Sequence, residues 1–130
     1  MMTMQTLDQR RAKHAWAAVQ KAKSESVQDY KREAKRLPLR IQTAGLGHAV
    51  AFANAKKKAN ERVAGDVATW VLEALNRDDR TSREKSRQLM EQITKNDADW
   101  LRRATQEALA YLMWLSRFAE AEIADGDNGE

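Results

Sequence analysis

The side chains best suited to catalysis or metal binding are few and widely spaced. The two histidines, His14 and His48, lie in different segments, and neither has a carboxylate at the spacing of a metal-binding or proton-transfer motif. The sequence also lacks a nucleophile elbow, a Walker A loop and any cysteine. We therefore predict no catalytic residue, no metal site and no cofactor, and we do not expect an enzyme.

A short glycine motif, Gly45-Leu46-Gly47, has two interpretations. Backbone N–H groups at the start of a helix attract phosphate, and glycine lets a ligand approach the backbone closely. The same pair of glycines can instead end one helix and form a tight turn before the next. We expect the structural turn, with His48 packed beside it.

Positive charge is concentrated in one half of the chain. Residues 1–60 hold 13 Lys and Arg against 4 Asp and Glu, whereas residues 61–130 hold 10 against 15. The halves therefore carry formal charges of +9 and −5, within a net charge of +4. Such a basic half favours a phosphate-bearing partner, whereas the acidic half favours a protein neighbour or solvent.

The composition predicts the class of fold that must position these charges. Strong helix formers are abundant, whereas the 130 residues include only two Phe, two Tyr and one Pro. We predict an all-α, single-domain bundle of five to six helices over residues 1–124, followed by a disordered acidic tail over residues 125–130. No signal peptide or apolar stretch of membrane-spanning length is present, so we expect a soluble, cytoplasmic protein without membrane contact.

Apolar residues at spacings of three and four locate the first helices. The first helix begins at Leu7, and it either breaks at a capping box that starts at Ser26 or continues through this point. Pro38 is expected to end the following helix at Leu37 and to begin a short third helix. The last helix is the longest, and Asn96 or Asp97 is expected to cap it.

The four tryptophans divide into two groups. Trp16, Trp70 and Trp100 fall on the apolar stripes of their helices, so we predict that they lie in the core. Trp114 falls toward the edge of the last stripe, together with Met113. Half-exposed Trp and Met are typical of contact surfaces, so these two residues form either a subunit interface or an ordinary part of the core boundary.

Two segments of the sequence together resemble a known family. Residues 30–58, YKREAKRLPLRIQTAGLGHAVAFANAKKK, run from an aromatic residue and basic residues through Leu-Pro and Ile to the glycine turn and a Phe-bearing helix. Residues 107–122, EALAYLMWLSRFAEAE, contain Tyr-Leu-x-Trp-Leu followed by Arg-Phe-Ala after one residue. In this order and spacing, the motifs resemble the small all-helical subunit of the Cmr (type III-B) CRISPR RNA-silencing complex.

The resemblance implies a non-catalytic role in an antiviral ribonucleoprotein. Members of that family are helical bundles that stack in a short row beside the subunits holding the guide RNA, and they help to cradle the guide and its paired target RNA. We therefore expect guide RNA, target RNA and other subunits of the complex as partners, together with stacking of copies on one another.

A guide–target duplex of any sequence must be held through its phosphates and its shape. The candidate contact residues flank Pro38 and follow the glycine turn, namely Lys31, Arg32, Lys35, Arg36, Arg40, Lys56, Lys57 and Lys58. A tight connection between their helices would bring the basic residues near Pro38 and those after the glycine turn to the same side of the protein. Without the resemblance and the charge distribution, a solvated helix face explains these residues better; with both, we favour nucleic-acid contact.

Two other functions are compatible with the same residues. The chain could be an assembly adaptor whose basic face binds an acidic protein, without RNA contact. It could also be a small DNA-binding protein, but the helix after the glycine turn is rich in alanine and mostly apolar, unlike a recognition helix.

Overall fold

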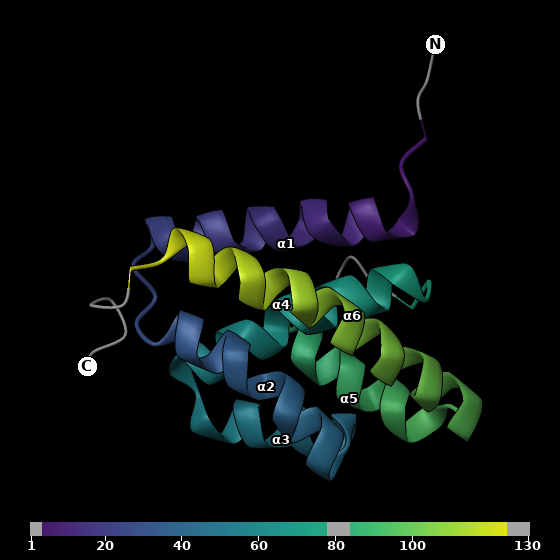
Figure 1. Ribbon diagram of the computed structural model, residues 1–130. Coiled ribbons are helices and arrows are strands. Elements are labelled where there is room, and N and C mark those ends of the chain that lie inside the picture. Colours follow the sequence, from purple (N-terminus) through teal and green to yellow (C-terminus); the bar gives the residue numbers. More distant parts are fainter. Residues whose placement is uncertain (1–3, 78–83, 125–130) are drawn as a thin grey trace.

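Six α-helices account for most of the residues that the computed structural model describes, which are residues 4–77 and 84–124 (Figure 1). Within these residues there is no strand, and the predicted all-α bundle of five to six helices is confirmed. The predicted tail, residues 125–130, lies outside the described residues. The helices are α1 (Leu7–Ser24), α2 (Tyr30–Ala44), α3 (Leu46–Lys56), α4 (Lys58–Ala74), α5 (Lys85–Lys95) and α6 (Ala98–Glu122).

The first and last helices pack side by side (Figure 1). Near the start of α1, Asp8 and Arg11 contact Trp114 and Glu107 of α6. Near the ends of both helices Gln20 contacts Glu122, so α1 and α6 run in the same direction. Helix α6 also contacts α2 and α4, and α4 contacts α3 and α5. The core therefore lies around α4 and α6, whose inward stripes are fully buried; it includes Val63, Val67, Val71, Tyr111, Leu112 and Leu115.

The position of Trp16 corrects one prediction. Trp16 is 44% exposed, whereas Ala15, Val19 and Ala22 form the buried stripe of α1. Small alanines let α1 approach α6 closely, and successive helical residues turn by about 100°, which places Trp16 at the edge of the contact. There its ring meets the ring of Phe118 edge-on, with centroids 5.2 Å apart. The core positions of Trp70 and Trp100 are as predicted.

The connection between α1 and α2 resolves the alternatives at Ser26. The helix breaks there, because α1 ends at Ser24 and both Ser26 and Asp29 adopt positive φ, 52° and 66°. The predicted capping box is absent, since Asp29 caps α2 without a side-chain hydrogen bond.

Helix α2 continues through Pro38, contrary to the prediction that it ends at Leu37. Proline removes one backbone hydrogen bond in a helix interior, but Leu37 and Ile41 on either side of it are both buried. Packing of these two turns outweighs the local preference. The helix instead ends at Gly45, where φ is 94° and the N–H donates to the Ile41 carbonyl at 2.8 Å, so the predicted glycine turn is confirmed.

Candidate nucleic-acid interface

The predicted basic residues lie on α2, at the end of α3 and at the start of α4. On α2, Arg32, Arg36 and Arg40 are spaced by four residues, which places them along one stripe of the helix. Helix α3 follows the turn at Gly45 and packs beside α2. The tight connection therefore brings the end of α3 close to this stripe.

Two of the predicted groups meet on the ring of Phe52. The Arg40 guanidinium carbon lies 4.6 Å from the ring centroid, and the Lys56 amine lies 5.3 Å from it. Phe52 is 41% exposed, so these cations stand at the surface. We call Arg40, Phe52 and Lys56 the Phe52 cluster. Cation–π contacts of this kind contribute about 0.5–1 kcal/mol at exposed sites and restrict the positions of the two charges.

Glu33 fixes the orientation of Arg40. Its carboxylate accepts a hydrogen bond from Arg40 Nη1 at 2.5 Å, and its side chain is only 5% exposed. The Arg40 head group is thus held on one side by a buried carboxylate and on another by the Phe52 ring. Arg36, one turn earlier, is exposed and has no ion-pair partner in the described part of the chain.

The junction between α3 and α4 has an unusual backbone. Lys57 has φ 63° and ψ −167°, and Lys58 has φ 54°. Positive-φ conformations of this type cost side-chain-bearing residues about 1–3 kcal/mol each, and they cluster at functional sites. All three lysines of residues 56–58 are exposed there, and Lys57 forms a surface ion pair with Glu61 at 3.3 Å.

Three predicted contact residues on α2 form pairs within the protein. Lys31 is only 7% exposed and its amine donates to the Ile123 carbonyl at 3.3 Å, so Lys31 does not belong to the exposed basic surface. Arg32 pairs with Asp29 at 3.7 Å, and Lys35 pairs with Glu120 at 3.8 Å. These two exposed pairs contribute at most about 1 kcal/mol each, so phosphate can compete with them.

A largely buried pair links α2 to α4 beneath this surface. The Tyr30 hydroxyl donates to Asp66 Oδ2 at 2.6 Å. Burial raises the pKa of the Asp66 carboxyl to about 6, although the Tyr30 hydrogen bond opposes this change. Arg62 stands nearby and donates two hydrogen bonds to Glu25, at 2.9 and 3.3 Å. The start of α2 is therefore held in register with α4.

A second polar network joins α1, α4 and α6. Arg11 donates to both carboxylate oxygens of Glu107, at 2.6 and 2.9 Å, and Trp70 Nε1 donates to the same carboxylate at 2.8 Å. The Arg11 hydrogen bonds lower the pKa of Glu107 and outweigh the opposing effect of burial. This network leaves Arg11 unavailable to an external partner.

Met113 and Trp114 differ in their surroundings. Trp114 turns toward α1, where its Nε1 donates to Asp8 at 3.0 Å and its ring lies 5.5 Å from that of Phe118. Met113 is 71% exposed. A role for either residue in a subunit interface stays a prediction.

Sequence reasoning does not identify Phe52 and Glu33 as supports of the basic residues. Phe52 belongs to the apolar pattern of its helix, and Glu33 is one acid among many. The feature of the sequence that points to their contact with the basic residues is the turn at Gly45, because it folds the residues before it against those after it. No helix among the described residues is long and apolar enough to cross a membrane.

The chain matches known proteins both in sequence and in structure. The family described as "CRISPR-associated protein (Cas_Cmr5)" matches residues 7–122. A protein of Thermus thermophilus named "CRISPR system Cmr subunit Cmr5" is 30% identical over 123 residues, which cover 94% of this chain and all of the relative. A crystal structure of a CRISPR-associated Cmr5 family protein from the same organism superposes with a TM-score of 0.72 at 27% identity, over 92% of this chain and 100% of that one.

Proposed function

The chain belongs to the Cmr5 family of CRISPR-associated proteins, and on this premise we propose that it is a non-catalytic subunit of a type III-B effector complex that helps to hold guide and target RNA. Its partners are then the two RNA strands and the other subunits of the complex, including neighbouring copies of itself. The name of the Thermus thermophilus relative, a subunit of the Cmr system, supports the assignment to a complex.

The Phe52 cluster is the observation that carries the RNA-binding part of the proposal. Two cations from α2 and α3 share one exposed ring, and Arg40 is held by the buried Glu33. Charges with fixed positions lose little freedom when they bind, which favours contact with a regularly spaced phosphate backbone. A solvated lysine and arginine face would not need a buried carboxylate to orient one of its members.

The same geometry favours recognition without regard to sequence. Lys56, Lys57 and Lys58 are exposed at the junction of α3 and α4, and Arg36 is exposed on α2. Such cations contact phosphates, whereas base-specific contacts require bidentate polar groups presented to base edges. A subunit that serves many different guides needs contacts of the first kind.

Charge reversal in the assembled complex tests the proposal. The variant Lys56→Glu/Lys58→Glu changes two exposed residues, and Lys58 is the first residue of α4, where a carboxylate suits the helix dipole. We expect weaker target RNA binding, and a log–log salt dependence of the binding constant that is shallower by roughly 0.7–0.9 for each phosphate that is no longer neutralised. The decrease in affinity should be similar for unrelated guide sequences.

The matched control is Arg102→Glu/Arg103→Glu, which makes the same change of charge on two exposed residues of α6. This control should leave RNA binding nearly unchanged. If both double variants lose affinity equally, or if neither changes the salt dependence while the complex still assembles, the basic surface does not bind RNA. Loss of assembly with unchanged RNA affinity of the remaining complex would favour the assembly adaptor.

A further inference from the structure

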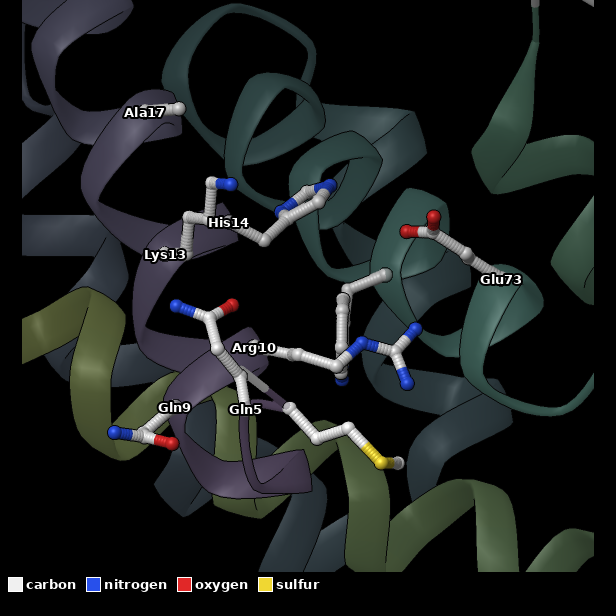
Figure 2. Close-up of a pocket in the computed structure, with 9 residues that line it drawn as sticks. Gln5, Gln9, Arg10, Lys13, His14, Ala17 and Glu73 are labelled. Atoms are coloured by element: carbon white, nitrogen blue, oxygen red, sulfur yellow. The ribbon is translucent and has the colours of Figure 1, made fainter. Parts of the chain in front are cut away.

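A cleft of about 830 Å³ opens between the first half of α1, the segment before it and the second half of α4 (Figure 2). Small-ligand sites in proteins occupy roughly 300–1,000 Å³, so this cleft has a suitable size. None of its lining residues belongs to the Phe52 cluster. Its helical walls are formed by Gln9, Arg10, Lys13, His14 and Ala17 of α1 and by Trp70 and Glu73 of α4.

One face of α1 supplies the basic wall of the cleft. Arg10, Lys13, His14 and Ala17 follow the spacing of three and four residues that places side chains on the same face of a helix. Figure 2 shows Arg10, Lys13 and His14 around the open region. Ala17 is small, so no long side chain of α1 fills the cleft at that end.

The two cations of this wall, Arg10 and Lys13, are not neutralised by ion pairs among the described residues. Arg10 lies over the indole ring of Trp70, 5.9 Å from its centroid, and neither Arg10 nor Lys13 forms an ion pair within residues 4–77 and 84–124. The next residue along the chain, Arg11, is by contrast fully engaged with Asp8 and Glu107. Two unneutralised cations one turn apart at the same cleft favour an anionic ligand.

His14 adds a hydrogen-bonding group without adding charge. Its Nδ1 lies 2.8 Å from the Tyr111 hydroxyl, and its ring packs 5.5 Å from that of Trp70, so the imidazole is held in place. Burial lowers the pKa of His14, and Glu73 opposes this effect only in part. The imidazole is therefore neutral near pH 7. Its second nitrogen, Nε2, has no hydrogen-bond partner among the described residues.

Glu73, on the α4 wall, narrows the class of ligand. Its carboxylate can accept hydrogen bonds from hydroxyl groups, and it repels an anion that would extend across the whole cleft. We infer that the cleft binds the ribose phosphate group of a nucleotide, with the phosphate at Arg10 and Lys13 and ribose hydroxyls at Glu73. The ligand is either a free nucleotide or the phosphorylated end of an RNA strand, because both carry the same phosphate and ribose.

Titration of the full chain with AMP, adenosine and inorganic phosphate tests the inference. Nuclear magnetic resonance should show chemical-shift changes at α1 and α4 around the cleft, and AMP should bind at least about tenfold more tightly than either fragment. Changes that map elsewhere would overturn the site. Equal affinity for AMP and for adenosine or inorganic phosphate alone would overturn the ligand class.

Variants on a single helix provide the matched comparison. Arg10→Ala/Lys13→Ala should reduce AMP affinity at least about tenfold, because each substitution removes a charge-assisted hydrogen bond to the phosphate. Lys21→Ala/Lys23→Ala removes the same charge from the other end of α1 and should have no effect. Glu73→Gln should strengthen binding of inorganic phosphate while reducing the preference for AMP over it. Equal decreases in the two double variants would overturn the inference.

Two short oligoribonucleotides that differ only in a 5′ phosphate distinguish a free nucleotide from the end of an RNA strand as the ligand. A strand end is the ligand if the phosphorylated RNA competes with AMP and the hydroxyl-terminated RNA does not. A free nucleotide is the ligand if AMP binds and neither RNA competes. These measurements do not depend on the Phe52 cluster, so their failure would leave the proposed RNA-holding function untouched.

Discussion

The largely buried carboxyl of Asp66 should make the stability of this protein depend on pH in an unusual direction. Replacing it in the variant Asp66→Asn removes the titration but keeps an oxygen that can accept the hydrogen bond of Tyr30. We expect this variant to be more stable than the natural protein at neutral pH and equally stable near pH 4. The reason is that the natural protein must hold a charge inside the bundle once Asp66 ionises.

The magnitude follows from the two pKa values of the group. The pKa is about 6 in the folded protein, against 3.8 for an unperturbed side chain. A raised pKa stabilises the folded state fully below pH 3.8, and this contribution is lost as the pH rises through about 6. The difference between the two pKa values corresponds to roughly 3 kcal/mol of unfolding free energy.

Urea unfolding at several pH values between about 4 and 7.5, followed by circular dichroism, measures the effect. The difference in unfolding free energy between Asp66→Asn and the natural protein isolates this one group, because all other titrating groups are shared. The matched control is Asp99→Asn, whose exposed carboxylate pairs with Arg102 on the surface of α6. It should change stability by less than about 1 kcal/mol.

Two results would refute this reasoning. One is a stability difference between the natural protein and Asp66→Asn that stays constant across the whole range of pH. The other is a variant that is less stable than the natural protein at neutral pH, which would mean that the ionised carboxylate is a net stabilising partner of Tyr30 and Arg62.

Three further substitutions have defined expected outcomes. Glu107→Gln should lower the unfolding free energy by about 2–4 kcal/mol in urea, because it leaves the partly buried Arg11 with only the exposed Asp8 as an anionic partner, and an unchanged midpoint would contradict this. Lys57→Gly should raise the unfolding free energy by about 1 kcal/mol, since glycine adopts φ 63° without strain. A lower melting temperature of this variant would show that no strain is stored at Lys57. Pro38→Ala should also raise the melting temperature by restoring a hydrogen bond within α2; a decrease would show that the restriction proline places on the unfolded chain is the larger effect.

The class of fold and the main turn could be predicted because local chemistry decides them. Gly45 accepts a positive φ that other residues adopt only at a cost, so its neighbours must end one helix and begin another. Asp97 was one of two candidate caps for α6, and its side chain does accept the N–H of Trp100 at 2.9 Å. Signals of this kind depend on residues that are close in sequence.

Pro38 and Trp16 show where such reasoning fails. The effect of Pro38 is local, but the burial of Leu37 and Ile41 that overrides it depends on helices far away in sequence. Trp16 has the spacing of a core residue. The neighbouring residue, Ala15, nevertheless occupies the core position, because α6 approaches α1 closely at this point. Both outcomes depend on the packing partner, which periodicity along one helix does not specify.

The candidate site was predictable as a region but not as individual residues. The charge distribution indicates where phosphate contacts can lie, and the turn at Gly45 explains why two groups of cations meet. The charge distribution does not distinguish Lys31 from Lys56. The Lys31 amine donates a hydrogen bond to the Ile123 carbonyl, whereas the Lys56 amine lies beside the exposed Phe52 ring. That distinction depends on which side chains the end of α6 covers.

The parallel packing of α1 on α6 makes the order of synthesis important. Arg11 and Glu107 are separated by 96 residues, so α1 finds this partner only after α6 has been synthesised. Until then Ala15, Val19 and Ala22 have no α6 to cover them. A chain that stops before Ala98 therefore loses the docking of α1 on α6, and until α6 is made the nascent protein exposes an apolar stripe of the kind that chaperones recognise.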